Sequence, residues 1–298
     1  MCPETMADWK LTCDPIVKRL RWVMLAAMLF SILSTLLGQP KSFWLHPQTA
    51  LRGDGLSIYN PTNHTFDFFL GHGWQAYVVA SLIYLAAAFL AVSLLPKMPA
   101  LITAFAAIFG HYFGVTLWLG SVWHLGAQGF ILYAVVLGAV LAFWVLPPAH
   151  ANDPIIRRLR WLMSAAILFD FIATLLGQPH TYWLHPETVN EADPLFSFFL
   201  LHGWIAGVLF YLVFLAATFL FVSVASRTTA LICIFALFFG HFNGASSWLF
   251  FRWRLGMQAP VLYGVLLSTL IVLLAFPTVK RSGSPANRMT SGPLNPDD

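Results

Sequence analysis

The chain has 298 residues, of which 59% are apolar and only 9% are charged, and its mean hydropathy is +0.74. Soluble domains carry about 25% charged residues, so this chain has too few charges to cover a water-facing surface. The composition therefore excludes a soluble enzyme, a disordered protein and a nucleic-acid binder, and it indicates an integral membrane protein with the lipid bilayer as its main partner. The net charge of +4 comes from basic residues that flank apolar runs and form no nucleic-acid-binding patch.

Eight long apolar runs follow one another along the chain. A helix needs about 20 residues to cross the hydrocarbon core, so each run predicts one transmembrane helix. The fold class that we expect is all-α and integral to the membrane, with eight transmembrane helices. The runs cover about 20–38, 67–95, 100–120, 128–146, 159–177, 197–225, 229–251 and 259–276.

The two halves of the chain repeat each other. Residues 14–47 align with 153–186, and 22 of the 34 aligned pairs are identical. We therefore expect a tandem duplication of a four-helix unit. Since each unit has an even number of helices, the two units share one orientation and form a parallel repeat. The expected divisions are an N-terminal cytoplasmic segment at 1–13, a first repeat at 14–148, a second repeat at 153–278, and a disordered C-terminal tail at 281–298.

The basic residues predict how the chain crosses the bilayer. If both termini are cytoplasmic, twelve Lys and Arg residues fall on the cytoplasmic side and four fall on the outer side. Cytoplasmic loops of membrane proteins carry an excess of Lys and Arg. The sequence therefore predicts a multi-pass protein of the cell or inner membrane with both termini in the cytoplasm.

Three repeated histidines per unit collect in or near the outer leaflet in this topology. Imidazole binds haem iron, copper and zinc, and an ionisable side chain inside the bilayer indicates function. We expect His72 to approach His111, and His202 to approach His241, as two cofactor-binding pairs. The alternatives are the aromatic belt at the interface, and hydrogen bonds between helices for the deeper pair.

His46 and His185 belong to the repeated motif Gln-Pro-x-x-x-Trp-Leu-His-Pro at 39–47 and 178–186. They are the candidate metal ligands outside the helices. The competing interpretation is that a histidine beside proline at a helix exit caps backbone groups.

One carboxylate breaks the symmetry of the two halves. Asp170 lies inside an apolar run where the first half has Ser31, and it is at nearly the same depth as His241. A charge there must be paired or protonated. We expect Asp170 to face the helix bundle and to contact His241 or Asn243.

The deep histidines are flanked by Gly110-x-x-x-Gly114 and Gly240-x-x-x-Gly244. Glycines four apart let a neighbouring helix approach closely, although they can also leave room for a flat cofactor. We expect packing, with the third helix of each unit at the centre of its bundle.

Three functions agree with these features. The first is a membrane protein that binds a haem or a transition metal for electron transfer or redox chemistry. The second is a transporter with a binding cavity between two pseudo-symmetric halves. The third is a non-catalytic subunit or assembly factor that binds other membrane subunits. Whether the protein is an enzyme stays open.

Overall fold

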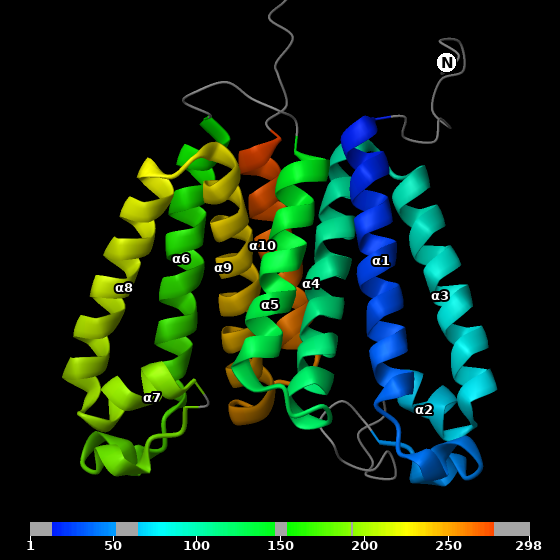
Figure 1. Cartoon of the computed structure of the whole chain (residues 1–298), viewed down its shortest axis with the longest axis horizontal. Helices are drawn as coiled ribbons and strands as arrows, with labels where there is room; N and C mark the ends of the chain where they lie inside the picture. The colour runs from blue at the N-terminus through cyan, green and yellow to red at the C-terminus, as the bar shows by residue number, and fades with distance from the viewer. Residues whose placement is uncertain (1–13, 52–64, 147–153, 192, 277–298) are drawn as a thin grey trace, which may run out of the picture.

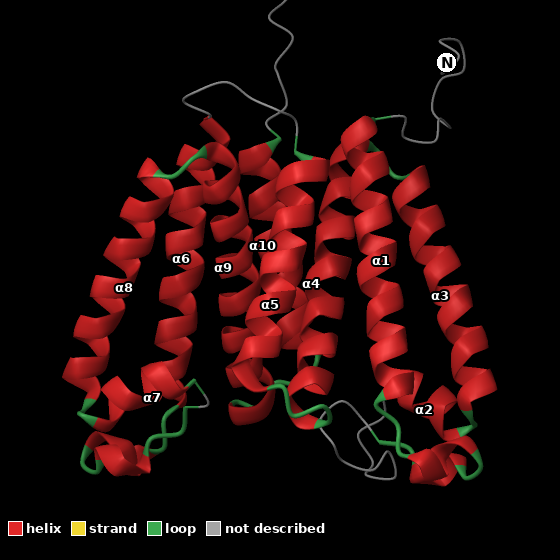
Figure 2. Cartoon of the chain, viewed as in Figure 1, coloured by secondary structure: helices red, strands yellow, loops and turns green. Residues whose placement is uncertain are grey.

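The computed structural model describes residues 14–51, 65–146, 154–191 and 193–276. All regular structure within these ranges is helical and no strand occurs in them (Figure 2). The expected segments at 1–13 and 281–298 lie outside the described residues.

Eight helices in this part of the chain are long and apolar enough to cross a membrane. The chain therefore has the architecture of a multi-pass membrane protein, as the composition predicts. In chain order the eight are α1 (Pro15–Leu37), α3 (Trp74–Leu94), α4 (Lys97–Ser121), α5 (Gly126–Val140), α6 (Pro154–Gly177), α8 (Trp204–Val224), α9 (Arg227–Ser247) and α10 (Gln258–Ala275). Short π-helical turns at Leu141–Val145 and Trp248–Arg252 extend α5 and α9.

The second apolar run of each half is not one helix. It divides into a short helix and a spanning helix, α2 (Thr65–Gly71) with α3, and α7 (Pro194–Leu201) with α8. The breaks fall at Gly73 and Gly203, whose φ angles are 106° and 99°. Only glycine adopts such angles readily, so the repeated His-Gly-Trp sequence marks the corner between the two helices.

The long helices stand side by side (Figure 1). At one end, called the basic end below, lie the first residues of α1, α4, α6 and α9. At the other, called the loop end, lie α2, α7 and four short 3-10 helices (Lys41–Trp44, Pro47–Thr49, His180–Trp183 and Pro186–Thr188). The helices α4, α5, α9 and α10 occupy the centre, α1 and α3 lie on one side, and α6 and α8 lie on the other.

The centre joins the two halves of the chain. Helix α5 packs against α9, and α10 packs against α4, so the last helix of each half lies on the third helix of the other. Phenylalanine side chains fill the contact between α4 and α9. Phe109 lies between Phe239 and Phe242, with ring centroids at 4.8 Å and 4.9 Å, and all three side chains are buried. Burial of so much aromatic surface stabilises the central contact.

Only one glycine of each Gly-x-x-x-Gly motif acts in helix packing as expected. A Cβ built on Gly110 or Gly240 meets no atom within 4 Å, so no neighbouring helix presses against either position. Only the second glycine of each motif faces another element, and that element is the first helix of its own half. The expectation that the third helix of each half is central among its own four helices is met, since α4 packs against α1, α3 and α5, and α9 packs against α6, α8 and α10.

Candidate functional site

A carboxylate and an imidazole are paired inside the helix bundle of the second half. Asp170 lies on α6, sixteen residues from its start at Pro154, and His241 lies on α9. Asp170 Oδ2 is 2.8 Å from Nδ1 of His241, and the two side chains are 9% and 8% exposed. The contact expected from the sequence between Asp170 and His241 is therefore present. A buried charge or polar group requires such a partner.

The other carboxylate oxygen is left over. Asp170 Oδ1 is buried and has no hydrogen-bond partner among the described residues. A carboxylate offers about four acceptor positions, so this oxygen can still accept a proton or a hydrogen bond. The pair can therefore accept a further hydrogen bond or a proton at Oδ1, inside an apolar helix bundle.

Gly244 provides the space for the carboxylate. A Cβ at this position would be 2.6 Å from both oxygens of Asp170, so any larger residue would displace the acid. The ring of Phe214 on α8 lies beside His241, with centroids 5.9 Å apart. Three helices, α6, α8 and α9, therefore enclose the pair.

The corresponding place in the first half has a different chemistry. Ser31 stands where Asp170 stands, and His111 contacts the ring of Tyr84 at 5.8 Å between centroids. A Cβ on Gly114 would lie 3.5 Å from Ser31 Oγ, which is an ordinary contact. The first half thus keeps the imidazole without the acid.

Asn243, the other expected partner of Asp170, binds elsewhere. Thr116 on α4 donates to Asn243 Oδ1 at 2.5 Å, and this bond joins the two halves at their central contact. The helix rotation explains the difference: Asn243 is two residues from His241, about 200° around α9, and faces the opposite side.

His72 and His202 do not approach the deep histidines. In each case Nδ1 donates to a carbonyl four residues earlier, that of Phe68 or Phe198, at 2.8 Å. The deep residue His111 lies beside Tyr84, which is ten residues after the first residue of α3, Trp74, and therefore about 15 Å along that helix. The expected approach of His72 to His111, and of His202 to His241, is therefore wrong. The prediction assumed that the two histidines of each pair lie at similar depths on two long helices. Instead, His72 and His202 follow the last residues of the short helices α2 and α7.

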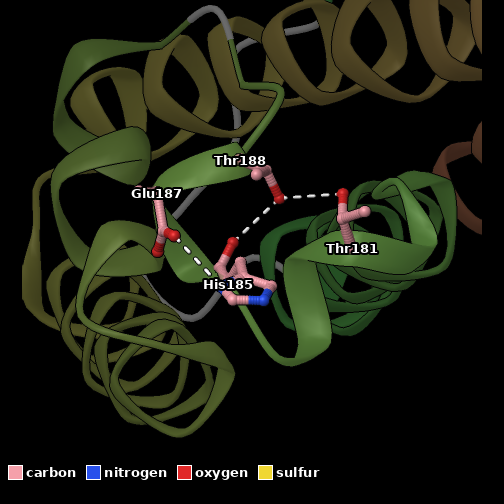
Figure 3. Close-up of polar contacts among 4 residues, drawn as sticks. All are labelled: Thr181, His185, Glu187 and Thr188. Atoms are coloured by element: carbon pink, nitrogen blue, oxygen red, sulfur yellow. Dashed lines mark hydrogen bonds and ion pairs between the residues drawn. The ribbon is translucent and has the colours of Figure 1, made fainter.

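His46 and His185 act mainly through their backbone. The carbonyl of each accepts a hydrogen bond from the hydroxyl of Thr49 or Thr188, at 2.9 Å and 2.8 Å. The ring of His185 points to Glu187, with Nδ1 3.2 Å from Oε1, and both side chains are exposed (Figure 3). Each of these histidines precedes a short 3-10 helix, but neither side chain makes a capping hydrogen bond, so capping by the imidazole is not observed at either position.

No group of three His, Cys, Asp or Glu side chains gathers in the described ranges to hold a metal ion. A haem clamped by two histidines would need two imidazoles on opposite sides of its iron, and the rings of His72 and His202 bond instead to the carbonyls of Phe68 and Phe198. The donor set expected from the sequence is thus not assembled in this part of the chain.

Sequence reasoning did not identify what the repeated glutamines do. Gln178 Oε1 accepts from the amide of Asn190 at 2.8 Å, and its Nε2 donates to the carbonyl of the same residue at 3.3 Å. Gln39 makes the same two bonds with Leu51. The only indication of this role in the sequence was that Gln precedes Pro in both copies of the motif. These side chains shape the loop end.

Comparison of the chain with protein-family models, with curated proteins and with solved structures found no match. The function therefore has to be argued from the site itself.

Proposed function

We propose that this protein is a proton-coupled transporter of the cell or inner membrane, in which Asp170 and His241 form the proton-binding pair. The observation that carries this proposal is the buried contact between the two side chains at 2.8 Å. Carboxylates and imidazoles within membrane helices are rare because burying them is costly, and they serve as proton relays in pumps and transporters.

The pair has the properties that a proton site requires. Both side chains are of ionisable types, they share a hydrogen bond, and Oδ1 of Asp170 is a second buried acceptor without a partner among the described residues. A proton added at either group changes the charge of the pair, and the low dielectric of the bundle makes that change energetically large. Such a change can shift the balance between two arrangements of packed helices.

The proposed transporter consists of two duplicated four-helix units, 14–148 and 153–278, with both termini cytoplasmic. Matched contacts support the duplication, since α1 packs on α4 as α6 packs on α9. The buried phenylalanines between α4 and α9 fill the contact between the halves. We therefore place the coupling site within α6, α8 and α9, and the first unit, which has Ser31, acts as the supporting half.

The proposal can be tested without knowing the substrate. The purified protein is adsorbed in proteoliposomes on a solid-supported membrane, and the charge displaced by a rapid pH step is recorded. We expect a transient current in the wild type that is lost in Asp170→Asn and retained in His111→Gln. Equal currents in the wild type and in Asp170→Asn would contradict the proposal.

Binding of a haem or a transition metal at His241 is the second candidate. One observation favours it: Asp170 holds Nδ1 of His241, and carboxylates orient metal-ligating imidazoles in this way. Metal analysis and an absorption spectrum test it. Iron, copper or zinc at one equivalent, lost in His241→Gln, would favour this candidate over proton coupling alone.

A further inference from the structure

Two arginines near the basic end have the same unusual surroundings. Arg21 on α1 donates from Nη1 to Ser93 Oγ at 2.5 Å, and its guanidinium lies over the ring of Phe89, with Cζ 4.3 Å from the centroid. Arg160 on α6 does the same with Ser223 at 2.5 Å and Phe219 at 4.2 Å. We call Arg21, Phe89 and Ser93 the first arginine site, and Arg160, Phe219 and Ser223 the second arginine site.

Each of these arginines has one donor for which the described part of the chain supplies no acceptor. Nε of Arg21 and Nε of Arg160 are buried and have no hydrogen-bond partner among the described residues. A buried donor without a partner is costly. The same unpartnered atom occurs at equivalent positions of the two repeated segments, and an acceptor from outside the chain would satisfy it at both.

The geometry of arginine indicates which acceptor fits. The guanidinium is a planar fork, and serine takes only Nη1. The edge formed by Nε and Nη2 is left, and this edge matches two oxygens of a phosphate or carboxylate. Both arginines are half-buried, so an anion can reach the guanidinium and, with a small rotation of the side chain, supply the acceptor that Nε lacks.

The position along the helix indicates the source of the anion. Arg21 and Arg160 lie six residues after Pro15 and Pro154, about 9 Å from the helix start. An exposed basic residue lies three positions earlier in each case, Lys18 and Arg157, on the same face of the helix. This depth matches the boundary between headgroups and acyl chains, where arginine side chains extend toward the phosphates.

We propose that each arginine site binds the phosphodiester of an anionic membrane lipid, with the Nε–Nη2 edge on the phosphate and the acyl chains along the exposed surface of α3 or α8. The inference is independent of the proposed proton coupling. Its chemistry, recognition of a phosphate oxyanion, is shared with free phosphate, and the experiment separates these two sources.

The test is native mass spectrometry of the purified full chain, titrated with phosphatidylglycerol. We expect two molecules to bind the wild type tightly and one to bind Arg21→Gln or Arg160→Gln. The substituted site should bind its lipid about tenfold more weakly or worse, since the charge-assisted hydrogen bonds of the Nε–Nη2 edge are lost, and the other site should be unchanged. Arg21→Lys keeps the charge but lacks the fork, and it should lose the same lipid.

The chain offers matched controls. Arg19 and Arg158 are exposed and donate to the carbonyls of Trp144 and Leu274. Their change to Gln removes the same charge and should leave both lipids bound. If these control variants lose as much bound lipid as Arg21→Gln does, the binding is a nonspecific attraction between basic residues and anionic lipid, and the proposal is overturned. Displacement of the lipid by inorganic phosphate would also overturn it, by assigning the sites to soluble phosphate. Unchanged thermal unfolding confirms that a variant is folded, and retention of both lipids by a folded Arg21→Gln/Arg160→Gln protein would refute the proposal.

Discussion

Gly244 lies so close to Asp170 that a Cβ on this glycine would be 2.6 Å from both carboxylate oxygens. The carboxylate of Asp170 therefore fits only because Gly244, on the neighbouring helix α9, has no side chain. In the first half, a Cβ on Gly114 would be 3.5 Å from Ser31 Oγ. Glycine is therefore required at position 244 in the second half, whereas the equivalent position 114 in the first half has room for a side chain.

Gly244→Ala should displace the acid and strain its contact with His241. Overpacking of a buried site costs about 1–3 kcal/mol, so the variant should unfold at a lower temperature than the wild type in detergent. Gly114→Ala is the matched control and should be close to neutral. If the carboxylate is the source of the strain, Gly244→Ala should lower the melting temperature of the wild type but cause little further loss when it is added to Asp170→Ser. Equal melting temperatures for Gly244→Ala and Gly114→Ala would contradict the geometry.

Gly240 should behave in the opposite way, because a Cβ there meets nothing within 4 Å. Alanine is more favourable than glycine inside a helix by about 0.8–1 kcal/mol. We expect Gly240→Ala, and likewise Gly110→Ala, to leave stability unchanged or to raise it in thermal unfolding. A marked loss of stability would mean that a helix packs on this glycine after all.

Asp170 and His241 should show energetic coupling. Breaking a buried pair by removing one partner costs about 3–5 kcal/mol, because the other group is left without compensation. Asp170→Ser and His241→Phe should each be strongly destabilising, whereas the double variant should cost clearly less than their sum. A double-mutant cycle in detergent unfolding measures this, and additive costs would argue that the two side chains do not interact.

The basic end supplies a prediction on pH. Asp14 accepts hydrogen bonds from the amides of Ile16 and Val17 and lies 2.6 Å from Lys97 Nζ. Burial alone would raise the pKa of its carboxyl, but the bonds from Lys97 and from these amides hold the pKa below the ordinary value of 3.8.

A carboxyl whose pKa is lowered by folding stabilises the protein at pH above its ordinary value, and the stabilisation is lost as the pH falls through the folded pKa. The melting temperature of the wild type should therefore fall on acidification from about pH 6 to about pH 3 more steeply than that of Asp14→Asn. Asp14→Ala should also cost about 1 kcal/mol at neutral pH, since it removes the N-cap of α1. An identical acid dependence in wild type and Asp14→Asn would contradict this role.

The sequence predicts the eight spans, and it predicts that Asp170 lies at the same depth as His241. Both predictions follow from counting residues along helices of fixed rise. Asp170 and His241 lie on neighbouring helices, α6 and α9, so equal depth was sufficient to place them together. The predicted pairing of His72 with His111 failed because Gly73 breaks the run, and a periodic apolar pattern does not report a corner whose only signal is one glycine.

The sequence also could not predict how each helix is rotated about its own axis. Every face of α9 is apolar enough to be buried or to face lipid, so periodicity could not separate the side of His241 from that of Asn243. The hydrogen bond between Thr116 and Asn243 depends on contact between helices of different halves. That contact follows from the tertiary packing of α4 on α9 and has no local signal.

The central claim is that Asp170 and His241 together bind an exchangeable proton within the membrane. Infrared difference spectroscopy of the protein in lipid, between high and low pH, detects the protonation of a buried carboxyl directly. We predict a carboxyl band that shifts in ¹³C-aspartate-labelled protein, is absent in Asp170→Asn, is displaced in His241→Gln and is unchanged in His111→Gln. A difference spectrum that is the same in the wild type and in Asp170→Asn would contradict the claim.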